Sequence, residues 1–130
     1  MSLFTADQIV AHLVGDYIIQ SDWMANEKTK QSLAAGIHAV TYTLPFLFIT
    51  QSLAALAVIA GTHFVIDRWR LARFVIWLKE RPWPGSLPFK EMGPTGYPAD
   101  KPAWLAVWLL ILADNTMHLI CNGIAIAVFA

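Results

Sequence analysis

The sequence predicts an all-α protein: a four-helix transmembrane bundle with a Pro/Gly-rich cytoplasmic loop between its third and fourth helices. Two observations predict this fold class. The chain of 130 residues is 57% hydrophobic and only 14% charged, with a mean hydropathy of +0.52, whereas soluble domains carry about 25% charged residues. Long apolar runs also alternate with short polar segments. We therefore expect a single integral membrane domain over residues 1–130.

The expected helices occupy residues 5–24, 33–51, 53–79 and 103–129. Pro45 is expected to kink the second helix because proline cannot donate a backbone hydrogen bond. The third helix becomes basic and aromatic after Asp67, which suits a membrane surface. Residues 80–102 are predicted to form a loop, since six of the seven prolines lie there and proline is disfavoured inside helices and strands alike.

The cationic residues predict how the chain is oriented. All nine Lys and Arg residues lie within residues 28–30 or 68–101. With four spans, both basic segments fall on one side, and the positive-inside rule makes that side cytoplasmic, with both termini outside. Membrane lipids are the expected partners, and the long apolar helices suit a homo-oligomer. A net charge of zero argues against nucleic acid as a partner.

Three of the apolar segments each carry a histidine and an aspartate four residues apart. These pairs are His12 and Asp16, His63 and Asp67, and Asp114 and His118. Residues four apart share one helix face and lie about 6 Å apart along the axis. In the expected topology, the reversed order in the fourth helix puts three carboxylates in one layer and three histidines in another. His38, near the start of the second helix, is expected to reach the carboxylate layer.

Buried carboxylates need compensation, and a metal ion would provide it. Each costs roughly 2.5–3.5 kcal/mol at mid-membrane, so three cost on the order of 7–10 kcal/mol if unpaired. Neutral imidazole and carboxylate are natural ligands of zinc, manganese and iron, and one such divalent ion is expected, or two bridged by carboxylates. The expected ligands are His12, Asp16, His38, His63, Asp67, Asp114 and His118. Gln20 and Asn115 are expected to hydrogen-bond around the site. Two alternatives stay open: metal-free His–Asp hydrogen bonds, and protonated carboxylates.

Several motifs carry a resemblance to a known family. They are His12-Leu-Val-Gly-Asp16-Tyr-Ile-Ile-Gln20-Ser-Asp-Trp23-Met24, His38-Ala, Thr62-His63-Phe-Val-Ile-Asp67-Arg68, Thr95-Gly96-Tyr97-Pro98 and Ala113-Asp114-Asn115-Thr-Met-His118. Over nearly its whole length, the chain resembles the small bacterial and phage membrane proteins of domain-of-unknown-function family 3307. The resemblance implies a multi-pass protein of the bacterial inner (cytoplasmic) membrane, and no particular activity. More loosely, the His-x-x-x-Asp pattern is similar to a group labelled membrane-bound metal-dependent hydrolases, from which the reversed pair departs.

The resulting hypothesis is a metal-dependent hydrolase acting at the cytoplasmic leaflet. The metal would activate a bound water as nucleophile, with Asp67 or Asp16 as base and Arg68 or Arg70 holding an anionic group. One alternative is a transporter or channel for protons or metal ions, which requires a polar path to both faces. Another is a non-enzymatic phage or bacterial membrane effector.

Overall fold

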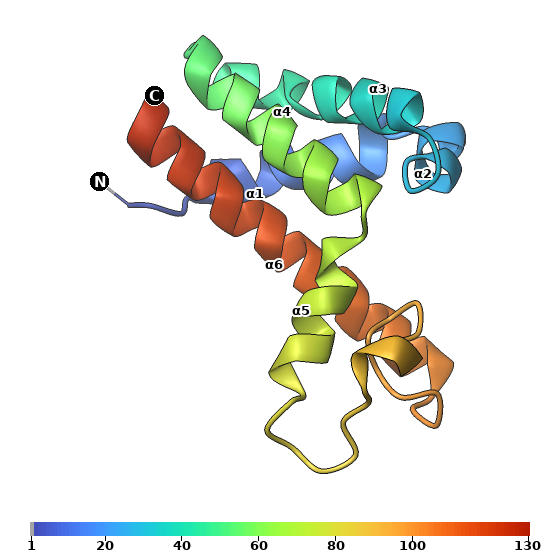
Figure 1. Cartoon of the computed structure of the whole chain (residues 1–130). Coiled ribbons are helices and arrows are strands. Elements are labelled where there is room, and N and C mark those ends of the chain that lie inside the picture. Colours follow the sequence, from blue (N-terminus) through green and yellow to red (C-terminus); the bar gives the residue numbers. More distant parts are fainter. Residues whose placement is uncertain (1) are drawn as a thin grey trace. The chain divides into compact units, whose positions relative to one another are not determined.

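The computed structural model describes residues 2–130, and every regular element in this part of the chain is helical (Figure 1). The all-α fold class predicted from the sequence is therefore confirmed. The described chain forms two compact units. The first consists of residues 2–69 and His118–Ala130, and the second of Arg70–Met117.

The first unit begins with α1 (Ala6–Leu13), which continues into a π-helix, η1 (Val14–Ile19). The single helix expected over residues 5–24 is wrong beyond Ile19, because Gln20 leaves helical geometry. The Gln20 side chain donates to the backbone carbonyl of Asp16 at 3.0 Å. Ser21 then starts a separate helix, α2 (Asp22–Glu27), by accepting a hydrogen bond from the backbone N–H of Met24, as helix-capping serines do.

The second apolar segment forms α3 (Ser32–Tyr42) followed by a 3-10 helix, η2 (Leu44–Phe48). A continuous helix over residues 33–51 was expected, and the α-helix ends earlier. Pro45 lies at the start of η2 and has no N–H to continue the α-helical ladder. The expected kink therefore takes the form of a tighter 3-10 turn.

The third apolar segment is divided, which corrects the helix expected over residues 53–79. The first unit contains α4 (Leu53–Arg68), and α5 (Leu71–Lys79) belongs to the second. Arg70 stands between them in the left-handed conformation, with φ 50° and ψ 53°, and a right-handed helix cannot continue through such a residue. Neither glycine nor proline marks this break, so helical periodicity gave no sign of it.

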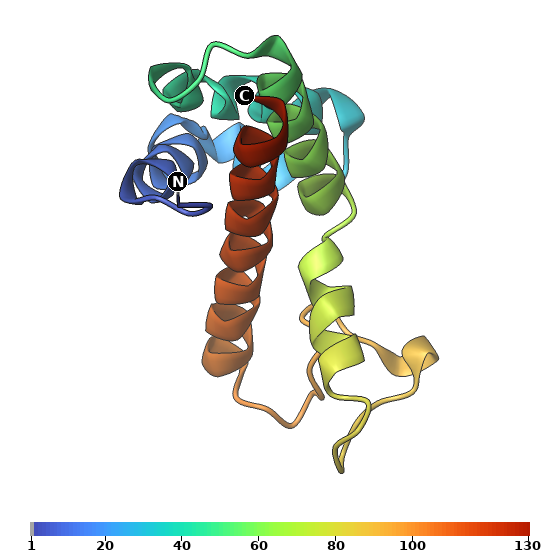
Figure 2. The same ribbon diagram turned by 90° about the vertical axis from the view of Figure 1, so that its left-hand side faces the viewer.

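The fourth predicted helix is confirmed as α6 (Ala103–Phe129). Its last part belongs to the first unit (Figure 2). There the Ser52 hydroxyl at the start of α4 donates to the carbonyl of Phe129 at 2.6 Å. Within that unit, α3 and α4 lie side by side (Figure 1). The apolar core of the first unit is formed by Ala11, Tyr42, Phe46, Ile59 and Ala125.

The second unit contains α5, the start of α6 and the loop between them. The loop is irregular apart from a 3-10 turn, η3 (Phe89–Glu91), in agreement with its proline content. Tyr97 packs with Ile76 and Ala106 in a small core. Gly96 has φ 83°, and a Cβ there would lie 2.2 Å from the Arg73 carbonyl oxygen. The turn can approach α5 this closely only because residue 96 has no side chain.

Among the described residues, only α6 is long and apolar enough to cross a membrane. The helical run Ser32–Phe48 is apolar but shorter, and α4 has 16 residues, against the roughly 20 of a full span. The structure thus supports an all-α chain with one candidate membrane span.

Candidate metal centre

Four buried side chains of the first unit bring their ligand atoms together, and we call them the His–Asp quartet. They are Asp16, His38, His63 and Asp67. The π-helix η1 carries Asp16, α3 carries His38, and α4 carries the other two one helical turn apart. None of the four is more than 4% exposed. The structure therefore brings together Asp16, His63 and Asp67, which belong to the predicted four-residue pairs, and His38, which was expected to reach the carboxylates.

The ligand atoms of the quartet lie close together. Nε2 of His38 lies 3.0 Å from Oδ1 of Asp16 and 3.2 Å from Oδ2 of Asp67. Nε2 of His63 lies 3.3 Å and 3.0 Å from the same two oxygens, and the two Nε2 atoms are 2.8 Å apart. The ligands of a tetrahedral zinc ion, at about 2.0–2.2 Å from the metal, lie about 3.3–3.6 Å from one another. The five distances given above are slightly shorter than those in such a shell, and all four ligand atoms lie within 4.8 Å of one another.

Hydrogen bonds alone do not satisfy this arrangement. Each neutral imidazole has one N–H to donate. If both Nε2 atoms carry a proton, two donors face each other at 2.8 Å. If one does not, its lone pair faces the Asp16 and Asp67 oxygens at 3.0–3.3 Å. With both carboxylates ionised, some contacts are then repulsive in either case, whereas a cation among the four atoms would attract all of them.

Two further histidines contact the outer carboxylate oxygens of the quartet. Nε2 of His118, on α6, lies 3.0 Å from Oδ1 of Asp67. Nε2 of His12, on α1, lies 3.7 Å from Oδ2 of Asp16. Each carboxylate therefore has one oxygen in the quartet and one beside another imidazole. Outer partners of this kind orient the ligands of metal sites, so the structure gives these two histidines a supporting position.

Unlike the carboxylates, the two imidazoles of the quartet have no outer hydrogen-bond partner in the part of the chain that the structure describes. Nδ1 of His38 and Nδ1 of His63 are buried without a hydrogen-bond partner among the described residues. The His63 ring is held by packing instead. It stacks on the Tyr42 ring, with 3.7 Å between centroids, and on the His118 ring, with 4.1 Å between centroids.

Tyr42 is a part of the site that the sequence reasoning missed. Its hydroxyl lies 2.6 Å from Nδ1 of His12 and accepts a hydrogen bond of 2.7 Å from Asn122. A Cβ at position 15 would lie 2.6 Å from the Tyr42 ring, so Gly15 makes room for it. The signal was present in the sequence, because Tyr42 follows His38 by four residues, the spacing of the His–Asp pairs.

Lys28 is a second residue that the sequence reasoning missed. Its Nζ lies 2.9 Å from Oδ2 of Asp67, and its side chain is 18% exposed. Arg68, which was expected to hold an anionic group, contacts the polypeptide instead. Its Nη1 donates to the Thr29 carbonyl at 2.8 Å and its Nε to the Ser32 hydroxyl at 3.3 Å.

Three of the predicted site residues belong to the second unit, namely Arg70, Asp114 and Asn115. Asp114 lies one helical turn before His118 on α6, and its role as a ligand stays a prediction. Gln20 bonds to the backbone of Asp16 rather than to its carboxylate, so it supports the helix end that carries this ligand.

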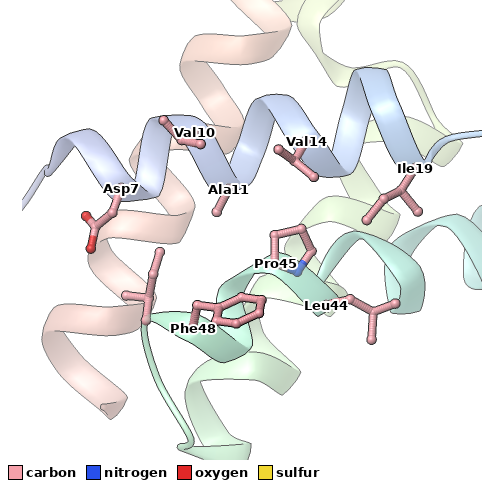
Figure 3. A pocket seen from close by; sticks show the side chains of 9 residues that line it. Asp7, Val10, Ala11, Val14, Ile19, Leu44, Pro45 and Phe48 are labelled. Carbon is pink, nitrogen blue, oxygen red and sulfur yellow. The ribbon is translucent and has the colours of Figure 1, made fainter.

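An apolar cavity of about 540 Å³ lies between the α1–η1 run and η2 (Figure 3). Ala11 and Val14 line one side, and Leu44, Pro45 and Phe48 line the other. Asp7 is the one charged residue in this lining. Ala11 is next in sequence to His12, so the cavity borders the helix that carries part of the site.

Comparison with known proteins adds a family and no activity. A family model described as "Protein of unknown function (DUF3307)" matches residues 4–129. No curated protein and no solved structure matches the chain. The resemblance predicted from the sequence motifs is thus confirmed.

Proposed function

Because this chain belongs to the DUF3307 family of proteins of unknown function, we propose its function from its own geometry: a hydrolase that depends on a divalent metal ion. The observation that carries this proposal is the quartet, four buried ligand atoms joined by contacts of 2.8–3.3 Å. With both carboxylates ionised, hydrogen bonds do not make all these contacts favourable, whereas a cation would attract all four atoms.

The quartet supplies two imidazoles and two carboxylates, a set that suits zinc and also manganese or iron. Such an ion, when bound, would lower the pKa of a water held as an additional ligand beside the quartet, since zinc can expand to five-coordinate. Asp67 is the preferred base. Its Oδ2 belongs to the quartet, while its Oδ1 faces Nε2 of His118 at 3.0 Å. A proton taken up at Oδ1 can therefore move to the imidazole of His118. Asp16, with Oδ2 toward His12, is the second candidate base.

We place the first unit in the bacterial inner membrane, with the basic residues near Lys28 on the cytoplasmic side and both termini outside. Large apolar side chains on its surface support this placement. Those more than 60% exposed include Ile18, Leu33, Val40, Phe48 and Leu53. In this placement the four apolar segments form the multi-pass bundle, although the shorter helices reach only part of the way across.

A lipid or lipid-linked phosphoester is the substrate class that fits this placement. The apolar cavity beside α1 supports it, because its walls of Ala11, Val14 and Phe48 suit an acyl chain. Other copies of the chain could pack against the exposed apolar face of α3, which makes a homo-oligomer compatible with the proposal.

The test is the metal content of detergent-purified protein, measured by mass spectrometry. We expect one or two equivalents of a transition metal in the wild type, and none in His63→Ala or Asp67→Asn. Asp22→Asn, an exposed carboxylate on α2, is the matched control and should keep the metal.

A folded wild type that takes up no zinc, manganese or iron would overturn the hydrolase proposal. The buried pairs would then serve proton or ion movement, to be tested by ion flux in liposomes, or the packing of a non-enzymatic effector.

A further inference from the structure

Lys28 is the cation of the first unit that contacts the quartet. Its Nζ lies 2.9 Å from Oδ2 of Asp67, an oxygen that also faces His38 and His63. The other cations of this unit have different contacts. Arg68 bonds to the Thr29 carbonyl, and Lys30 lies 3.6 Å from a Glu27 carboxylate oxygen.

The segment that carries Lys28 is held at several points. The Lys28 N–H closes the end of α2 by donating to the Met24 carbonyl at 2.9 Å. Arg68 then fixes the following residues through Thr29 and Ser32. Arg68 is therefore a positioning residue for this segment. A lysine carried by a flexible loop would lose side-chain and backbone freedom on binding, and this lysine has already lost much of it.

The Lys28 side chain is 18% exposed, whereas the side chain of Asp67 is 3% exposed. A molecule that approaches the quartet past Lys28 meets its ammonium group before it meets the buried ligands. An ammonium group has three N–H donors, so it can contact Asp67 and an oxyanion at the same time. A bound divalent metal would also offset part of the carboxylate charge that now attracts this ammonium.

We propose that Lys28 binds the phosphoryl group of the substrate and so restricts the proposed hydrolase to phosphoesters. This inference rests on the proposed metal site and names the substrate class for it. It replaces Arg68 by Lys28 as the anion-binding residue of the first unit. The phosphoryl group could belong to a membrane lipid or to a soluble ester, and the experiment separates these sources.

The experiment measures binding of inorganic phosphate and of phosphatidic acid in nanodiscs to the full-length, zinc-loaded protein by calorimetry. We expect Lys28→Gln to weaken binding about tenfold to hundredfold, because a charge-assisted hydrogen bond is lost. Lys30→Gln makes the same change in charge on the same segment, at a side chain that is 65% exposed, and should bind as the wild type does. Binding of phosphatidic acid alone, sensitive to Lys28→Gln, assigns the group to a lipid; binding of both probes assigns it to phosphoesters generally.

Three results would overturn the inference. Lys28→Gln could bind both probes as tightly as the wild type, or Lys30→Gln could be weakened equally, which would show a general charge effect. Lys28→Gln could also lose its zinc, measured in the same sample, which would make Lys28 a support of the metal site only. A wild type that binds no zinc contradicts the proposed function itself, and this is known before phosphate is added.

Discussion

The two units of this chain use their polar side chains in different ways. The first contains all four histidines and buries them beside Asp16 and Asp67. The second places cations over aromatic rings, at 4.0–4.8 Å from cation to ring centroid. These pairs are Arg73 with Phe74, Arg81 with Trp77, and both Lys79 and Lys101 with Tyr97.

The difference lies in where the two units place their charges. The first has three cations against five carboxylates, and the second has six against four. Buried charges are costly unless compensated, and in the first unit imidazoles and Lys28 lie beside the two buried carboxylates of the quartet. Under the proposed function, a bound metal ion would add to this compensation. Cation–π pairs at exposed sites contribute about 0.5–1 kcal/mol each without burying a charge. In the second unit, the turn at Gly96 also packs closely against the backbone of α5.

Metal removal should have the largest effect and should act on the first unit alone. A ligand at a thousand times its Kd stabilises a fold by about 4 kcal/mol. Chelation should therefore lower amide hydrogen-exchange protection in α3 and α4, and leave α5 unchanged. Equal loss of protection in α5 would show that the units do not differ in this way.

Gly96→Ala should have the next largest effect, on the second unit. The left-handed backbone costs a non-glycine residue about 1–2 kcal/mol, and the new Cβ would meet the Arg73 carbonyl oxygen. We expect about 3 kcal/mol of destabilisation in total, seen as faster exchange in α5. Gly85→Ala is the matched control, because Gly85 has φ 82° and no atom within 4 Å of its Cβ position; it should cost only the backbone term. Similar costs for both variants would contradict close packing at Gly96.

Tyr42→Phe should weaken metal binding about tenfold, since partners of ligand-supporting residues contribute on this scale. It removes the hydroxyl that contacts His12 and Asn122, while the ring stays on His63. Tyr97→Phe, in the second unit, should leave zinc affinity unchanged. Zinc competition with a chromogenic chelator measures both variants, and equal affinities would remove Tyr42 from the site.

Lys101→Gln should have the smallest effect. It removes one cation–π contact with Tyr97 at 4.7 Å and should cost less than about 1 kcal/mol. The zinc content should not change. A loss of zinc in this variant would show that the charge of the second unit bears on the quartet, contrary to the separation described above.

Local patterns predicted much of the fold. The long, mostly apolar run of α6 and the prolines of the preceding loop segment, residues 80–102, identified both elements correctly. The division between α4 and α5 escaped prediction because Arg70 can also occupy a normal helix, and only its surroundings place it in the left-handed region. The π-helix at Val14–Ile19 likewise has the apolar pattern of an α-helix.

The candidate site was predictable in so far as it repeats one spacing. Four-residue steps linked His12 with Asp16 and His63 with Asp67, and the structure brings both pairs together. The same step separates His38 from Tyr42, a pair that lies outside the predicted pattern because it contains no carboxylate. Lys28 could not be found this way, since its contact with Asp67 joins residues far apart in sequence.

Composition and local periodicity were enough to predict the helical class, the apolar character and the small set of residues able to bind a metal. Only the packing of the helices shows which of these residues meet. It brings the ligand atoms of the quartet into contacts of 2.8–3.3 Å, places His12 and His118 beside the outer carboxylate oxygens, and sets Lys28 rather than Arg68 against Asp67. Spacing along one helix specifies a face, whereas the packing of several helices decides what that face contacts.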